Sequence, residues 1–143
     1  PRLIDMGAET FLLASTMSAI MGQRIARKIC VTCKTSYVPP KEVVAEIRKV
    51  LGTLMTIRDE EVKLFKGQGC PACGNTGYQG RIGIFEVLVV SEKIAKLILE
   101  KSDSNTIERL AVEEGMITMK QDGYLKALEG ESSIDEILRV AQD

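Results

Sequence analysis

The 143-residue sequence contains no histidine and no tryptophan, and it has only three phenylalanines and three tyrosines. Because histidine is absent, neither a Ser/His/Asp triad nor a Cys/His pair can form, and these routes of nucleophilic catalysis are excluded. So few aromatic side chains also offer little of the stacking surface on which proteins bind single-stranded nucleic acid. Composition alone therefore argues against both a triad hydrolase and a nucleic-acid stacking platform.

Neither sign of charge is in excess, because 19 Lys and Arg residues balance 20 Asp and Glu residues. A general nucleic-acid binder needs a surplus of positive charge, so we expect no nucleic-acid partner. The sequence also lacks a G-x4-G-K-[ST] loop, so it has no element that cradles the phosphates of ATP. Its acidic residues are scattered as on solvated helix faces. We therefore predict no catalytic residue and no nucleotide-binding residue in this chain.

Long apolar runs are missing as well. The longest, Phe11 to Met21, is interrupted by Ser15, Thr16 and Ser18, and it is shorter than the roughly 20 residues that a membrane-spanning helix needs. We expect no transmembrane segment. The sequence opens with "PRLIDMG" and has no initiator methionine, so we expect a piece of a longer protein.

The chain does contain four cysteines, arranged as two C-x2-C pairs: Cys30 with Cys33, and Cys70 with Cys73. Two such turns can place four thiolates at the corners of a tetrahedron, about 2.3 Å from a zinc ion. Four thiolates leave no open coordination position, and soft sulfur ligands favour zinc or iron–sulfur over magnesium or calcium. The spacing therefore predicts a structural zinc site.

Basic residues flank the first pair, and we expect Arg27, Lys28 and Lys34 to offset the negative charge of four thiolates around a divalent ion. Two other interpretations of the cysteines stay open. In the first, the metal site is empty or has been lost in this chain. In the second, the cysteines carry out redox chemistry or form disulfides, although a redox role needs only one C-x2-C pair.

Hydrophobic patterns predict the first elements. Residues 8–20 favour a helix with a mostly buried face that includes Phe11 and Leu12, and "MGQRIARKIC" suits a helix or a strand equally. "PPKEVVAEIRKVLG" predicts a helix that begins near Pro40 and stops at Gly52. We expect its apolar stripe to seal a small core; the stripe contains Val43, Val44, Ile47, Val50 and Leu51.

The second half of the chain predicts one strand and then helices. "RIGIFEVLVV", Arg81 to Val90, indicates a buried strand in which Glu86 needs a cationic partner, with Arg24, Arg27 and Arg81 as candidates. Residues 91–143 indicate a small helical bundle with stops at Gly115 and Gly130. The expected helix starts are Ser91 and the pairs Asn105/Glu108, Thr118/Gln121 and Ser133/Glu136.

Five segments follow one another in a recognisable order: "RLIDMG" (2–7), "FLLAS" (11–15), "QRIARKIC" (23–30), "GCPACGNTGYQGRIGIFEVL" (69–88) and "GMITMKQDG" (115–123). Each is weak by itself, but their order and spacing, with the two C-x2-C pairs, are specific. In these segments nearly the whole chain resembles the carboxy-terminal third of the hexameric ATPases of type II secretion and type IV pilus assembly.

The resemblance implies an α+β fold: the end of a RecA-like domain with an inserted tetracysteine zinc subdomain, followed by the helical bundle. Residues 1–29 would be the trailing part of the RecA-like ATPase domain, 30–80 the zinc subdomain, 81–90 a strand returning to the RecA-like sheet, and 91–143 the C-terminal helical domain. The Walker motifs and their histidine-containing box would precede this piece. Whether this chain is itself an enzyme therefore stays open.

The resemblance also assigns individual residues. The four cysteines match the family's metal ligands, and Val31 departs from the proline that many relatives have after the first cysteine. Five further residues match the family's Q-R and G-R-x-G-x-x-E patterns, which implies that they tie the base of the insert to the RecA-like sheet or lie near nucleotide or a neighbouring subunit. These residues are Gln23, Arg24, Arg81, Gly83 and Glu86.

The function implied by the resemblance is that of a motor. The longer protein would be a hexameric ring that binds ATP and Mg²⁺, carries a structural Zn²⁺ and acts on an inner-membrane platform protein. It would be cytoplasmic and peripheral to the inner membrane, and it would power pilus assembly or protein secretion. The alternative from the residues alone is a stand-alone zinc-dependent module that binds a protein or a nucleic acid.

Overall fold

The computed structural model describes residues 2–141, and the ends of the expected first and last domains, residues 1 and 142–143, lie outside the described residues. It contains both helices and strands, which confirms the α+β class, and it divides into two compact units. The first unit combines Pro1–Gly22 with Glu86–Thr118, and the second combines Gln23–Phe85 with Met119–Asp143. Among residues 2–141 we find no helix with the length and apolar character that a bilayer crossing requires.

Over its described residues, 2–22 and 86–118, the first unit consists mainly of four helices, and α2 packs on α4, which in turn packs on α5. Ile94 on α4 is fully buried and Ala111 on α5 nearly so. The helices are α1 (Arg2–Asp5), α2 (Thr10–Thr16), α4 (Glu92–Leu99) and α5 (Ser104–Glu113). The long strands β1 (Ala19–Ile29) and β4 (Tyr78–Val89) pair with each other and have residues in both units.

The helix expected over residues 8–20 is shorter than predicted. Helix α2 stops at Thr16, and strand β1 begins at Ala19. The hydroxyl of Ser15 donates to the carbonyl of Phe11, and that of Thr16 donates to the carbonyl of Leu12, and such bonds disfavour continued helix. The predicted buried face is also wrong, because Phe11 is 66% and Leu12 53% exposed.

The predicted starts of the next two helices differ in accuracy. Ser91 caps α4 as expected, since its hydroxyl accepts from the amide of Ile94. Helix α5 begins before the predicted Asn105/Glu108 box, because the carboxylate of Asp103 accepts from both the amide and the hydroxyl of Thr106. An aspartate at the N-cap satisfies the first amides and interacts well with the helix dipole, so it sets the start.

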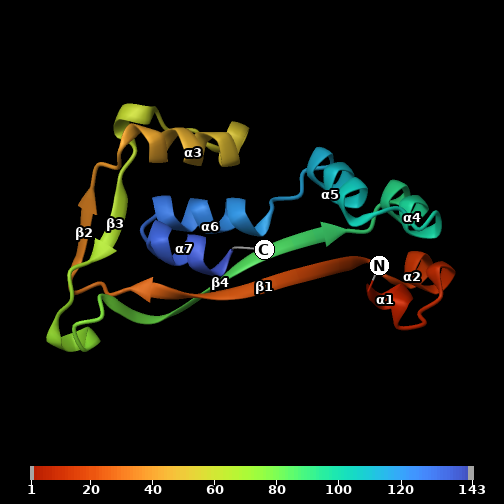
Figure 1. Cartoon of the computed structure of the whole chain (residues 1–143), viewed down its shortest axis with the longest axis horizontal. Helices are drawn as coiled ribbons and strands as arrows, with labels where there is room; N and C mark the ends of the chain where they lie inside the picture. The colour runs from red at the N-terminus through yellow and green to blue at the C-terminus, as the bar shows by residue number, and fades with distance from the viewer. Residues whose placement is uncertain (1, 142–143) are drawn as a thin grey trace. The chain divides into compact units, whose positions relative to one another are not determined.

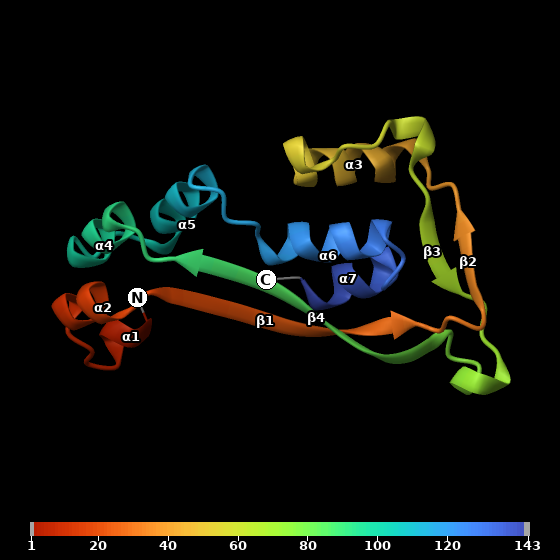
Figure 2. The ribbon, with the colours of Figure 1, turned by 180° about the vertical axis from the view of Figure 1, so that it is seen from behind.

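In the part of the chain that the structure describes, the second unit contains a two-stranded antiparallel sheet, three helices and one end of each long strand (Figures 1 and 2). Strands β2 and β3 pair antiparallel, with Lys34 opposite Gly67 and Tyr37 opposite Leu64; the sequence patterns did not predict this pairing. Both views show α6 and α7 between α3 and the long strands. The elements are β2 (Lys34–Tyr37), β3 (Leu64–Gly67), α3 (Lys41–Leu51), α6 (Met119–Leu128), α7 (Ile134–Val140) and 3₁₀ turns at Gly52–Leu54, Asp59–Glu61 and Pro71–Cys73.

The apolar core of the second unit lies where α3, α6 and α7 meet. The predicted stripe on α3 is confirmed, because Val44, Ile47 and Leu51 are buried and the other two stripe residues pack against the same core. Tyr124 and Ile137 bring α6 and α7 into it. Its remaining buried members are Ala26, Met55, Val62, Leu64, Ile84, Ala127 and Ile134.

Strand β4 is less buried than we predicted for Arg81–Val90. It begins earlier, at Tyr78, and of residues 81–90 only Ile84 is buried. The reason is that β1 and β4 form a sheet of two strands in the described residues, so β4 has a neighbouring strand on one side at most, and side chains such as Val89 stay exposed (65%). Glu86 is half-buried rather than buried.

All the helices expected after residue 91 are present. Helices α4 and α5 belong to the first unit, whereas α6 and α7 belong to the second. Helix α6 begins at Met119, directly after the predicted Thr118, and Gly130, at φ 74°, follows its end. The domain boundaries that the resemblance implies stay predictions.

Gly123 on α6 gives a test of the α6–α7 packing. A Cβ added there would lie 2.5 Å from Cγ2 of Ile137, which is attached to a stiff β-branched carbon. Gly123→Ala should stabilise helix α6 by about 1 kcal/mol, because alanine has the higher helix propensity. Overpacking costs about 1–3 kcal/mol, and a contact of 2.5 Å cannot be relaxed by a small movement of the side chains. We expect a net loss of about 1 kcal/mol in urea unfolding. Adding Ile137→Leu, which removes Cγ2, should restore part of it, and a stabilised single variant would contradict this packing.

Candidate metal centre

The four cysteines predicted as metal ligands lie together. Their Sγ atoms are all within 4.8 Å of one another, and no other group of three or more His, Cys, Asp or Glu side chains in the described chain has metal-ligand proximity. The sulfur of Cys30 is 3.9 Å from that of Cys70, Cys33 is 3.9 Å from Cys73, and Cys70 is 3.7 Å from Cys73. Thus the fold brings the two pairs to one point.

These spacings fit a tetrahedral thiolate site. Four sulfurs about 2.3 Å from a central zinc ion lie about 3.8 Å from one another, which agrees with the 3.7–3.9 Å of the Cys30–Cys70, Cys33–Cys73 and Cys70–Cys73 pairs. All four cysteines are free, and the separations are well beyond the roughly 2.05 Å of a disulfide bond. The donor set is suited to a closed zinc site.

A tight turn builds the second pair. Cys70 is extended, Pro71 begins a 3₁₀ turn that ends at Cys73, and Gly74 and Asn75 follow with φ values of 58° and 61°. The amide of Asn75 donates back to the carbonyl of Cys70 at 2.9 Å. Glycine and asparagine tolerate this left-handed region better than other residues, so the sequence just after the cysteines permits the turn.

Gly77 joins the two pairs through its backbone. Its carbonyl accepts from the amide of Cys30 at 3.0 Å, and its own amide donates to Sγ of Cys73 at 3.3 Å. Gly67, at the end of β3, lies so close that a Cβ on it would come within 2.0 Å of the Gly77 carbonyl oxygen. Only glycine at position 67 allows this approach, because any side chain would collide with backbone.

The surroundings of the sulfurs shift their pKa values in different directions. Burial tends to raise the pKa of Cys73, but amides of Cys70 and Gly77 donate to its sulfur and lower the pKa to about 6. Burial raises the pKa of Cys33 to about 11. The amides around Cys73 thus stabilise a thiolate at neutral pH, which is the form that binds a metal ion.

The three cations that flank the first pair have partners of their own. Arg27 pairs with Glu136, Lys28 pairs with Glu131 at 2.7 Å, and Nζ of Lys34 lies 4.4 Å above the ring of Phe65. We expected these cations to offset thiolate charge, and we expected Arg27 as a candidate partner of Glu86. The ion pairs with the α6–α7 region were not predicted.

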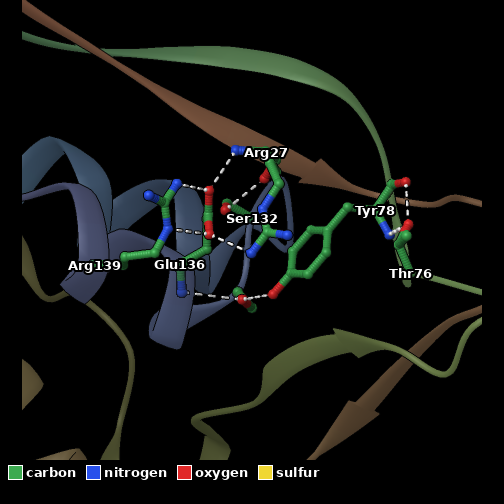
Figure 3. A network of polar contacts seen from close by, with 7 residues as sticks. Arg27, Thr76, Tyr78, Ser132, Glu136 and Arg139 are labelled. Carbon is green, nitrogen blue, oxygen red and sulfur yellow. Dashed lines mark hydrogen bonds and ion pairs between the residues drawn. The ribbon is translucent and has the colours of Figure 1, made fainter.

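Glu136 is a buried carboxylate at the centre of a polar cluster whose arginines, Arg27 and Arg139, are more than half exposed (Figure 3). Its side chain is fully buried, and its carboxylate accepts from the amide of Arg27 at 3.0 Å and from the guanidinium groups of Arg27 at 2.7 Å and Arg139 at 2.6 Å. The predicted N-cap Ser133 is confirmed, since it accepts from the amide of Glu136. The hydroxyls of Ser133 and Tyr78 are 2.6 Å apart.

The comparison with known families agrees with the cysteine pattern and with the segments around it. Residues 1–139 match the family model described as "Type II/IV secretion system protein". The chain belongs to this family. Its relatives include the type IV pilus assembly ATPase PilB of Thermus thermophilus, 34% identical over 96% of this chain, and PilB of Pseudomonas aeruginosa, 35% identical over 99%. The type II secretion system protein E of Xanthomonas campestris is 36% identical over 99%.

These relatives are much longer proteins. The chain spans 15% of the Thermus protein and 24% of each of the other two. The chain is therefore similar to one region of these longer proteins, and the comparison does not cover the rest of their length.

Of the residues that match the family's Q-R and G-R-x-G-x-x-E patterns, Gln23 and Gly83 are neighbours, because a Cβ on Gly83 would lie 3.4 Å from Nε2 of Gln23. Gln23, Arg24 and Arg81 are exposed on β1 and β4. The carbonyl of Gly83 accepts from Nζ of Lys126 at 2.9 Å in the second unit. In the first unit, Glu86 lines an apolar pocket of about 360 Å³. Their roles stay predictions.

Sequence patterns missed Tyr78, Ser132 and Glu136 as neighbours of the metal centre. The Ser133/Glu136 spacing predicted a helix start. In a capping box the Glu136 carboxylate would accept from the amide of Ser133, but here it accepts from the guanidinium groups of Arg27 and Arg139. One available signal was Tyr78, since a single tyrosine in the glycine-rich stretch after Cys73 has no evident role in a metal turn.

The Glu136 cluster predicts an acid-sensitive contribution to stability. The guanidinium of Arg139 and then that of Arg27 lower the pKa of Glu136 to about 2, against the opposing effect of burial. The contribution is therefore complete above the ordinary pKa of about 4.5 and is lost as the pH falls toward 2. Glu136→Gln should cost about 2–3 kcal/mol at pH 7, because it weakens hydrogen bonds to a charged group, and the difference from the unchanged protein should shrink by pH 2.

Urea unfolding at several pH values measures this difference, and any metal lost in acid is lost by both proteins alike. Glu131→Gln is the control, because its partly exposed pair with Lys28 should contribute less than about 1 kcal/mol. A gap for Glu136→Gln that does not change with pH would contradict the assignment.

Proposed function

We propose that this chain is the carboxy-terminal part of a hexameric ATPase motor that powers type IV pilus assembly or type II protein secretion, with a structural zinc site at its four cysteines. The observation that carries the proposal is the match of residues 1–139 to the secretion family, combined with four cysteine sulfurs that all lie within 4.8 Å of one another. Catalysis would belong to the longer protein, which would bind ATP and Mg²⁺ outside this chain.

Burial supports a structural role for the metal. From residue 65 to residue 83, a stretch that is fully described, Gly77 alone is buried. An apolar core therefore does not hold the second cysteine pair in place. A zinc ion on Cys30, Cys33, Cys70 and Cys73 would supply the missing cross-link, because metal binding to such sites is coupled to folding.

The proposed parts of the motor follow the resemblance. Residues 1–29 and 81–90 would belong to the RecA-like domain, 30–80 to the zinc subdomain and 91–143 to the helical domain. Gln23, Arg24, Arg81, Gly83 and Glu86 would tie the base of the insert to the RecA-like sheet. The partners would be other copies of the same protein in the ring and an inner-membrane platform protein, at the cytoplasmic side of the inner membrane.

Metal analysis tests the zinc site directly. We expect about one zinc ion per chain in the purified protein, and none in the double variant Cys70→Ser/Cys73→Ser, since two thiolates are too few for a closed site. Val31→Ala is the matched control: Val31 lies between the first two cysteines and is 77% exposed, so the variant should keep its zinc. Zinc far below one equivalent, with all four thiols freely reactive, would contradict the site.

A second experiment tests the motor. The longer protein carrying Cys70→Ser/Cys73→Ser should fail to restore pilus assembly or secretion in cells that lack the gene, whereas Val31→Ala should restore it. Deletion of the gene without loss of pili or of secreted protein would exclude the motor and favour a stand-alone zinc-dependent binding module.

A further inference from the structure

We infer that the four-cysteine site is energetically coupled to helix α7 through Tyr78 and Arg27, so that a metal ion on the cysteines stabilises the α6–α7 corner. We define this corner as residues 129–137. The inference rests on the proposed zinc site and adds a second element whose stability depends on the metal.

The first connection runs through β4. Gly77 is bonded to both cysteine pairs, through the amide of Cys30 and the sulfur of Cys73. The next residue is Tyr78, so its position is set by those bonds. Its hydroxyl reaches 2.6 Å from that of Ser133, which is 97% buried and caps α7.

The second connection runs through β1, the strand that ends at Ile29, directly before Cys30. The carbonyl of Arg27 accepts from the hydroxyl of Ser132 at 2.8 Å, and the amide of Ile29 donates to the carbonyl of Glu131 at 3.0 Å. The side chain of Arg27 then pairs with Glu136. Strand β1 thus fixes both the turn before α7 and the first turn of the helix.

The two connections are themselves in contact. The guanidinium carbon of Arg27 lies 4.2 Å from the centre of the Tyr78 ring, within the range of a cation–π interaction. Figure 3 shows Tyr78 reaching from β4 toward the cluster of Arg27, Glu136 and Arg139. A shift of either cysteine pair therefore disturbs contacts on both routes to α7.

Residues of the β2–β3 sheet also contact the corner. A Cβ on Gly130 would lie 2.4 Å from Nζ of Lys34 and 2.7 Å from Cδ2 of Phe65. Lys34 follows Cys33 directly, so the turn between α6 and α7 rests against residues that the first cysteine pair holds in place. The polar contacts of the α7 start therefore come from residues close in sequence to the cysteines.

Thermodynamic linkage makes the coupling measurable in both directions. If bound metal stabilises the corner, then an intact corner raises metal affinity by the same factor. Loss of a corner contact should therefore weaken zinc binding, although none of the corner residues is a ligand.

Hydrogen–deuterium exchange of the full chain with Zn²⁺ and after chelation is the first test. Amides of α7 should exchange about fivefold faster or more without zinc, whereas amides of α4 and α5, which lie in the other compact unit, should not change. Unchanged exchange in α7, with faster exchange in residues 70–78, would overturn the inference and leave the zinc site intact. A chain that binds no zinc would overturn both.

Zinc affinity of two tyrosine variants is the second test. Tyr78→Phe removes only the hydroxyl that meets Ser133, and Tyr124→Phe is the matched control, because it removes a buried hydroxyl that donates to Glu46 of α3 at 3.1 Å. Competition with a zinc chelator should show binding weakened about threefold to fivefold in Tyr78→Phe and unchanged in Tyr124→Phe. Equal affinities in both variants would overturn the coupling.

Discussion

The close approach of two backbones, at Gly67 and Gly77, is the constraint on which the second unit depends. A side chain at position 67 would collide with the Gly77 carbonyl, so the end of the β2–β3 sheet can meet the second cysteine pair only because both residues are glycine. That contact sets Gly77 between Cys30 and Cys73. The metal centre, the β2–β3 sheet and the start of β4 thus share one packing constraint. This constraint comes from two glycines, neither of which is a metal ligand.

Features with strong local chemistry were predictable from the sequence. The two C-x2-C pairs predicted four sulfurs at one point because few other arrangements use four thiolates, and the sulfurs do lie together. The apolar stripe of α3 and the N-caps Ser91 and Ser133 followed from helical spacing and capping preferences. In each of these cases the residues that determine the feature are close in sequence or recur at a spacing typical of a helix or of metal ligands.

Features that depend on distant partners were not predictable. Arg27 and Glu136 are 109 residues apart in sequence, and no periodicity links them. The pairing of β2 with β3 is similar, because each strand has only four residues and too little pattern to reveal a neighbour. The burial of β4 was overestimated for another reason: an apolar strand is buried only where strands or helices cover it, and within residues 2–141 β4 has β1 alone as its neighbour in the sheet.

The Glu136 cluster shows how polar contacts complement a small core. Ile137, the next residue, is fully buried against α6, and apolar contacts of this kind hold α7 close without specifying its direction strongly. A buried carboxylate between Arg27 of β1 and Arg139 of α7 is different, because it is satisfied only at one position and orientation. The side chains of Arg27 and Arg139 are 51% and 60% exposed, so solvent screening limits the net stability that these ion pairs contribute. We therefore attribute to this cluster mainly the placement of α7 relative to β1, beside the residues that lead into the cysteine site.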